Sequence, residues 1–242
     1  MVNKYKIADK VVSINSIYED VHMYCSDYRT DEPTDYILTI SQSDIEYERK
    51  KSANEDKLKG ITIKNYTDQY LEELAVYRKI SEKMIDYDTV LFHGSVIAVD
   101  GVGYLFTAKS GTGKSTHAKI WCELFKERAV MVNDDKPLLK ITDNGIIAYG
   151  TPYNGKHRIG TNISVALKAI CILTRDTTNH IEQITREQAY ATLLQQVYRP
   201  ADIIKLKKTL SLIDTIADSV KLYQLGCNMN LLAAKVAYEG MQ

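Results

Sequence analysis

The sequence lacks a net charge and any long apolar run, and each absence excludes a class of protein. Lysine and arginine together number 31, as do aspartate and glutamate. A neutral chain has no general attraction for nucleic acid or for an anionic membrane surface. No apolar run of signal-peptide type stands at the N-terminus, and none is long enough to cross a bilayer. We therefore expect a cytoplasmic protein that binds neither nucleic acid nor membrane, in which local charges hold any anionic ligand.

Cysteine is also scarce. The four copies, Cys25, Cys122, Cys171 and Cys227, are widely separated and form no CxxC pair. This spacing argues against a zinc site or a redox pair. Cys122 and Cys171 sit among apolar residues and are interpreted as reduced thiols of the core.

The length of 242 residues leaves room for one large α/β domain, or for one domain with a smaller appendage. Residues 1–66 contain short, alternating segments typical of strands. The segment 46–59 is dense in charge and is interpreted as a loop or a hairpin end. We therefore predict a β-rich N-terminal region over 1–66 and a larger α/β domain over 67–242. The strands expected in the N-terminal region are 11–17, 21–25, 36–40 and 59–63.

Residues 67–242 alternate helical and strand-like patterns. A helix is expected from Thr67 to about Asp86, followed by a strand-like run over 89–99 that His93-Gly94 interrupts. Asp100-Gly101 is a strong signal for a hairpin turn into a second strand over 103–107. Further on, strands are expected at 129–132, 138–141, 145–149, 165–174 and near 222–225. Helices are expected at 116–126 and from the capping box at 185–188 to about 198. Two more helices are expected, one after residue 200 and one from residue 231.

The segment Ala108–Thr116 has the composition of a phosphate-binding P-loop, with alanine at the usual first glycine. It follows a strand and opens a helix, which is the context that this motif requires. Glycines let successive backbone N–H groups turn toward phosphate oxygens, and the helix N-terminus adds positive charge. Lys114 is expected to reach the β- and γ-phosphates of ATP, and the Ser115 hydroxyl to ligate Mg²⁺. The residues expected to bind the nucleotide are Ser110, Gly111, Thr112, Gly113, Lys114, Ser115 and Thr116.

Asp134 and Asp135 end the apolar strand that follows the P-loop helix. One carboxylate can hold Mg²⁺, directly or through water, and the other can accept a proton from an attacking hydroxyl. The alternative is an acidic turn that caps the next element. Adjacent residues at a strand end point in opposite directions, so the sequence does not decide which of the two is the base.

Two further segments are candidates for the same site. His93 lies on the strand that pairs with the P-loop strand, although a histidine at such a position is usually a satisfied core or edge residue. The polar loop 150–158 contains glycines and positive charge, and its Lys156 and Arg158 could clamp a transferring phosphoryl group. The alternative for this loop is a solvated basic surface.

Residues 90–137 resemble the HPr kinase/phosphorylase family, which is in turn similar to phosphoenolpyruvate carboxykinases. The resemblance lies in His93-Gly94, in the hairpin leading to the P-loop, in Ser-Gly-x-Gly-Lys-Ser over 110–115, and in the strand ending at 134–135. It implies an α/β fold with a P-loop kinase core and a mixed sheet, here preceded by the β-rich region.

The resemblance also implies roles for individual residues. Lys114 and Ser115 would hold ATP and Mg²⁺, and Asp134 would be the base that activates a substrate serine, with His93 close to it. Asp135 would support the metal or the base.

This chain departs from the family pattern in three places. Thr116-His117 stands where an acidic residue usually follows the P-loop serine. The loop 150–158 stands in the place of the acidic and arginine-containing signature, and residues 1–66 differ from the N-terminal domain of the family. The chain is therefore more similar to single-domain relatives that phosphorylate other serines, in modified peptides or small molecules.

The sequence as a whole predicts a Mg²⁺- and ATP-dependent kinase that phosphorylates a hydroxyl, favouring a serine, of a peptide, a protein or a small molecule. Two alternatives remain, a carboxykinase-like enzyme acting on a small organic acid and a non-catalytic nucleotide-sensing module. The first would need a second metal site with histidine and lysine ligands, which the sequence does not assemble. A homo-oligomer is compatible with the sequence, which leaves the oligomeric state open.

Overall fold

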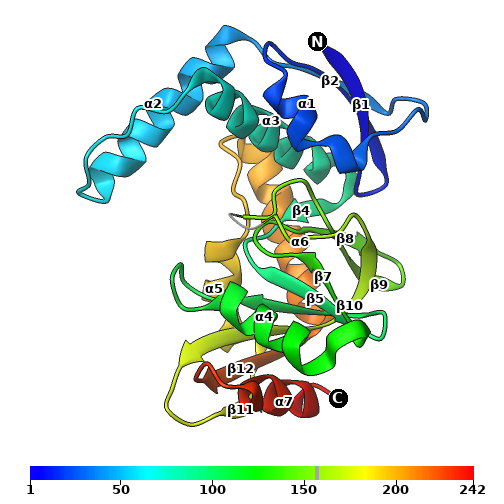
Figure 1. Cartoon of the computed structure of the whole chain (residues 1–242), viewed down its shortest axis with the longest axis vertical. Coiled ribbons are helices and arrows are strands. Elements are labelled where there is room, and N and C mark those ends of the chain that lie inside the picture. Colours follow the sequence, from blue (N-terminus) through cyan, green and yellow to red (C-terminus); the bar gives the residue numbers. More distant parts are fainter. Residues whose placement is uncertain (156–157) are drawn as a thin grey trace. The chain divides into compact units, whose positions relative to one another are not determined.

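The computed structural model describes residues 1–155 and 158–242, which divide into two compact units, Met1–Lys83 and Met84–Gln242. We call these the N-terminal unit and the C-terminal unit (Figure 1). The boundary predicted after residue 66 falls inside the N-terminal unit. Ion pairs explain this position, because Arg78 and Lys79 of helix α3 (Asp68–Met84) bind Glu48 and Asp44 of helix α2 (Gln42–Leu58).

The N-terminal unit contains a small sheet with the order β1-β2-β3. Strands β1 and β2 form an antiparallel hairpin, and β3 lies parallel to β2. Tyr5, Val12 and Ile14 are buried under this sheet, and the Tyr5 hydroxyl lies 2.8 Å from Nδ1 of the buried His22. The β character predicted for this region is therefore confirmed for its first and third expected strands. The bounds are β1 Val2–Ile7, β2 Lys10–Asn15 and β3 Tyr36–Thr39.

Three interpretations of this region were wrong. The charge-dense segment 46–59 lies almost entirely in helix α2 and is not a loop. Few apolar residues of α2 are buried, whereas its charged Glu48 is buried. Ion pairs to α3 take the place of an apolar stripe in this helix. The segment 21–25 lies largely in helix α1 (Asp20–Tyr24), and the segment 59–63 contains no strand among the described residues. A 3₁₀ turn, Ser26–Tyr28, follows α1.

The C-terminal unit is built on a mixed nine-stranded sheet. Its path runs β4-β8-β9-β10-β6-β5-β7, and β12 pairs with β10 and with β11. Strand β10 pairs with three other strands along its length. It lies parallel to β6 and to β12 and antiparallel to β9. The bounds are β4 Thr89–Leu91, β5 Ser95–Val99, β6 Val102–Thr107, β7 Ala129–Asn133, β8 Leu138–Thr142, β9 Gly145–Tyr149, β10 Ser164–Arg175, β11 His180–Gln183 and β12 Lys221–Cys227.

Helices cover both faces of this sheet. Alternate residues of each strand point to opposite faces, so Leu105 packs in one core and Phe106 in the other. The first core also receives Leu193 and Ile213 from α5 and α6, and the second receives Trp121 of α4 and buried alanines of α7. Figure 1 shows α4 and α7 side by side on their face of the sheet. The bounds are α4 Lys114–Phe125, α5 Arg186–Gln196, α6 Ile203–Ser219 and α7 Leu231–Gly240, with 3₁₀ turns at Ile85–Tyr87 and Lys126–Arg128.

Local sequence signals in this unit are confirmed. Strands β5 and β6 form a hairpin whose turn residues Asp100 and Gly101 both have positive φ, as the Asp-Gly signal requires. The run over 89–99 is broken at His93-Gly94 into β4 and β5. Thr185 caps α5 and exchanges hydrogen bonds with Gln188. Among the described strands of this unit, β11 had no counterpart in the sequence-based expectation, as was also the case for β1 of the N-terminal unit.

The capping box predicts a measurable contribution to stability. Replacing Thr185 by alanine removes the hydroxyl that accepts from the Gln188 backbone N–H, and should lower the free energy of unfolding by about 1 kcal/mol. Thr185→Ser keeps the acceptor and should stay close to wild type. Urea denaturation of the three proteins would measure the difference, and an alanine variant as stable as the serine variant would contradict this role.

Candidate functional site

Three strands deliver the predicted site residues to one edge of the sheet. Strand β6 ends at Thr107 and leads into the P-loop, and β5 begins opposite that end, with Ser95 paired to Phe106. Strand β7 ends beside the start of β5, with Val96 paired to Asn133. His93, the P-loop and the acidic pair therefore converge, although they are separated along the chain.

The P-loop turns between β6 and helix α4. Gly111 and Gly113 have φ values of +80° and +121°, which L side chains rarely adopt, and no other group lies within 4 Å of the position of an added Cβ. Helix α4 begins at Lys114 directly after this turn, so its N-terminal N–H groups face the loop. The Lys114 ammonium is buried and donates to the carbonyl of Ala108, 3.1 Å away.

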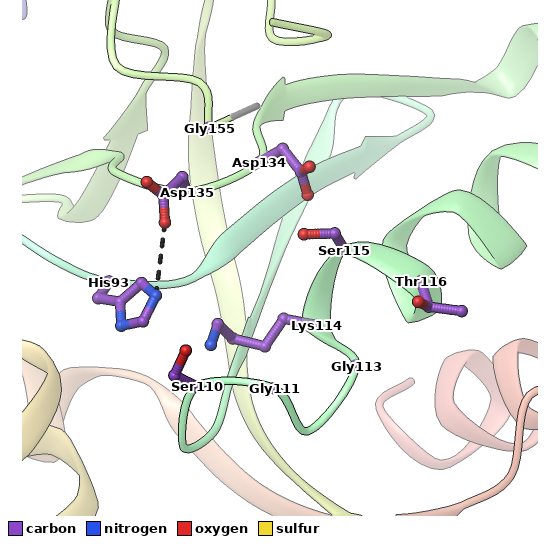
Figure 2. A pocket seen from close by; sticks show the side chains of 10 residues that line it. All are labelled: His93, Ser110, Gly111, Gly113, Lys114, Ser115, Thr116, Asp134, Asp135 and Gly155. Atoms are coloured by element: carbon purple, nitrogen blue, oxygen red, sulfur yellow. Dashed lines mark ion pairs between the residues drawn. The ribbon is translucent and has the colours of Figure 1, made fainter. Parts of the chain in front are cut away.

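A pocket of about 500 Å³ opens over the P-loop. Figure 2 shows the Lys114 side chain running into it from below and the two aspartates facing it from above. Burial lowers the pKa of Lys114, with Lys136 acting in the same direction, and the nearby Asp135 and Asp134 oppose the shift. The pocket is lined by His93, Ser110, Gly111, Gly113, Lys114, Ser115, Thr116, Asp134, Asp135 and Gly155.

Asp134 faces the start of helix α4. Its carboxylate accepts a hydrogen bond from the Ser95 hydroxyl at 3.1 Å, and Figure 2 shows the Ser115 hydroxyl turned toward it. Burial raises the pKa of Asp134, while hydrogen bonds from Ser95 and Ser115 and the charge of Lys119 act in the opposite direction. A carboxylate and a hydroxyl thus lie together beside the phosphate loop, which is a donor set that suits a hard cation.

Asp135 faces His93 instead. The His93 Nε2 atom lies 3.4 Å from Asp135 Oδ1, as the dashed line in Figure 2 marks. Burial lowers the pKa of His93, and the positive charges of Lys136 and Lys114 lower it further, against the effect of Asp135. A neutral His93 that faces a carboxylate carries its proton on Nε2, so we assign this tautomer.

Backbone hydrogen bonds hold this acidic turn in place. The Asn133 side chain accepts from the N–H groups of Asp135 and Lys136, and the Gly94 N–H donates to the carbonyl of Asp135. Asn133 in turn donates to the Thr151 hydroxyl at 3.0 Å. The chain thus bends directly after Asn133, and both aspartates line the same pocket.

Not every expected residue reaches the pocket. Of the described residues, Thr112 lies on the other side of the loop, where it lines a second pocket, and Arg158 is exposed and lines neither. Lys156 lies outside the described residues. Gly155 belongs to the candidate loop 150–158 but was not singled out as a site residue; a Cβ at this position would stand 3.3 Å from that of Asp135.

Two residues that support the P-loop were also missed. The guanidinium of Arg175, at the end of β10, donates to the loop carbonyls of Gly111 and Thr112. His117 lies in the first turns of α4, 2 % exposed, and its Nε2 accepts from the indole of Trp121 at 3.0 Å. Burial lowers the pKa of His117 to about 4. An arginine at the end of a long strand gives no signal in the sequence, because the loop that it contacts is far away along the chain.

Two further features are absent from the described residues. No group of three or more histidine, cysteine, aspartate or glutamate side chains within residues 1–155 and 158–242 could hold a metal ion by itself. In the same ranges, every helix is too short or too polar to span a membrane. A cation at this site would therefore need ligands from a bound molecule beside the few that the protein supplies.

Comparison with known proteins identifies the family. Residues 61–230 match the family described as SynChlorMet cassette protein ScmC, and the chain belongs to this family. No curated protein matches the chain. Among solved structures, the HPr(Ser) kinase/phosphatase from Coxiella burnetii matches with 14% identity, over 62% of this chain and 94% of that one, at a TM-score of 0.34. A TM-score of this size does not establish a shared fold.

The buried His117 predicts how stability depends on pH. Its pKa is about 4 in the folded chain and about 6.5 when unfolded, so its stabilising contribution is complete above pH 6.5 and is lost as the pH falls toward 4. Between pH 7.5 and pH 5, wild type should lose about 2 kcal/mol more unfolding free energy than His117→Gln, which keeps an acceptor for Trp121. Urea titrations at both pH values would measure this, and equal losses in the two proteins would refute it.

Proposed function

We propose that this member of the ScmC family transfers the γ-phosphoryl group of Mg-ATP to a hydroxyl, favouring a serine, of a peptide, protein or small molecule. One observation carries the proposal: a single pocket gathers a P-loop lysine, a hydroxyl beside one carboxylate, and a histidine beside another. In this proposal the C-terminal unit is a P-loop kinase core of the HPr kinase/phosphoenolpyruvate carboxykinase type. The resemblance of residues 90–137 to that family supports it.

The chemistry of the loop fits a polyphosphate. Gly111 and Gly113 hold the backbone in conformations that turn N–H groups into a concave anion site, and the start of α4 adds its dipole. Lys114 places a buried positive charge inside the same pocket. Together these groups can bind and orient a triphosphate chain, which suits phosphoryl transfer because positioning and charge neutralisation supply most of its catalysis.

Asp134 and Ser115 fit a magnesium ion. Mg²⁺ usually takes one or two protein ligands and completes its shell with phosphate oxygens and water, so a full protein cage is not needed. We therefore place the metal between the Ser115 hydroxyl and the Asp134 carboxylate, where it would neutralise charge on the phosphates. This assignment exchanges the two roles that the family resemblance implied, and the direction of each side chain in Figure 2 supports the exchange.

Asp135 is then the base. Its carboxylate takes the proton of the acceptor hydroxyl while the hydroxyl oxygen bonds to the γ-phosphorus. The bond between that phosphorus and the β–γ bridging oxygen breaks, which leaves ADP and a phosphorylated acceptor. His93 faces Asp135 with its Nε2 atom and orients the carboxylate. Lys114 neutralises the charge that develops, since Arg158 is exposed and does not line this pocket.

Label transfer from γ-labelled ATP tests the function. The family description names a cassette, so peptides and proteins encoded beside this chain are the first acceptors to try. With a phosphorylated acceptor in hand, Lys114→Met should reduce transfer by at least ~100-fold, because it removes a preorganised charge at the phosphates. Lys109→Met is the control, since Lys109 belongs to the same loop, is exposed and does not line the pocket over it. Tight ATP binding without any transfer or hydrolysis would instead favour a nucleotide-sensing module.

The two aspartates should fail in different ways. Asp135→Asn removes the proposed base and should lower the rate constant by roughly 100- to 10,000-fold with ATP affinity retained. Asp134→Asn removes a metal ligand and should raise the Mg²⁺ concentration needed for half-maximal rate. Rates measured across a Mg²⁺ series, with ATP affinity from calorimetry, separate the two effects. A magnesium-dependent defect in Asp135→Asn alone would reverse the assignment.

A further inference from the structure

A second pocket lies on the other side of the P-loop. Its volume is about 430 Å³, and it shares Gly111, Gly113 and Thr116 with the pocket that contains the aspartates. Its walls come from the ends of β10 and β12, which run parallel to β6 and end at the same edge of the sheet. Crevices at the carboxyl ends of parallel strands are the usual ligand sites of α/β sheets. One loop thus separates two adjoining pockets.

The two pockets differ in charge. The first contains the Lys114 ammonium beside two carboxylates, whereas the second contains one cation, Arg175, and one anion, Asp176. Arg175 already donates to two carbonyls of the loop, and hydrogen bonds from the following turn keep the pKa of Asp176 low, so its carboxylate stays negative. Among the described residues, no other lysine or arginine lines this pocket, so it offers no unengaged cation to a phosphate and suits an uncharged group. Its apolar lining includes Ile120, Leu173 and Met229.

An unpartnered donor lies at this pocket. The Trp121 indole donates to Nε2 of His117, and an indole N–H can only donate, so the neutral ring carries its proton on Nδ1. That Nδ1 atom is buried and has no hydrogen-bond partner among the described residues. Buried polar groups are rarely left unpaired, and His117 lines the second pocket, so a bound molecule that displaces the ring slightly can accept from this N–H.

We propose that the second pocket binds the nucleoside of the nucleotide whose phosphates occupy the P-loop. The base packs against the side chain of Met229, which is 80% exposed. An acceptor atom of the nucleoside faces the His117 Nδ1–H. A flat, uncharged heteroaromatic group with acceptor nitrogens fits both the apolar wall and this donor. This inference rests on the proposed nucleotide binding and adds the residues that recognise the nucleoside.

Calorimetry with two ligands tests the pocket without relying on catalysis. Met229→Ala should weaken ATP binding about 3- to 10-fold, the scale of a lost contact between sulfur and a ring, and leave inorganic tripolyphosphate unchanged. Ile204→Ala is the matched control, because Ile204 is 75% exposed on α6 and lines neither pocket. Equal losses for both ligands, or no loss for either, would overturn the inference.

Alkylation of cysteine gives an independent readout. Cys227 lines the second pocket and is partly exposed, whereas Cys122 on α4 is also partly exposed but does not line it. ATP should protect Cys227 of the unchanged protein from N-ethylmaleimide, tripolyphosphate should not, and Cys122 should react alike in both. Protection by both ligands or by neither, when both bind, would reject the nucleoside pocket alone. Absence of binding for both ligands would reject the proposed function itself.

Discussion

Pairing on both edges of strand β5 is the constraint on which the candidate site depends. With β6 on one side and β7 on the other, the P-loop, His93 and the acidic pair all meet at one end of these strands. A shift of either pairing by one residue would turn every side chain of that strand to the opposite face of the sheet, because side chains alternate with a period of two. The two buried cores on either side of β5 oppose such a shift. Packing far from the site therefore sets the distances within it.

Electrostatics in the pocket follow from the same convergence. Burial lowers the pKa of Lys114 and of His93 and raises that of Asp134, so the low-dielectric surroundings disfavour the charged forms of these three groups. The opposite charges of the lysine and the acidic pair offset much of this cost.

The sequence predicted what short-range signals encode. Three such signals depend on residues close together in the chain: the Asp100-Gly101 turn, the P-loop and the Thr185 cap. The structure contains the hairpin that the first implied and the helix starts that the other two implied. Helix α2 was missed because buried ion pairs with α3 stabilise it, and these leave no apolar periodicity to detect.

The rest of the site depends on contacts that no local pattern contains. Alternation along a strand suggested that Asp134 and Asp135 point apart, yet the chain turns at Asn133 and both line one pocket. Gly155 and Arg175 reach the loop and the acidic turn from distant segments. Their positions could not be read from residue types, because they follow from the pairing of β10 and from the path of the loop after β9.

The long-range pairing of β10 also orders the events by which the chain folds. The β5–β6 hairpin joins neighbouring segments and closes a short loop, whereas the parallel pairing of β6 with β10 must close a loop of many more residues. Such non-local pairings form slowly. A nascent chain would thus possess its glycine-rich turn well before Arg175 arrives to hold the carbonyls of that turn in place. The fully supported turn is, on this view, a late product of folding, completed only when the second half of the chain has been made.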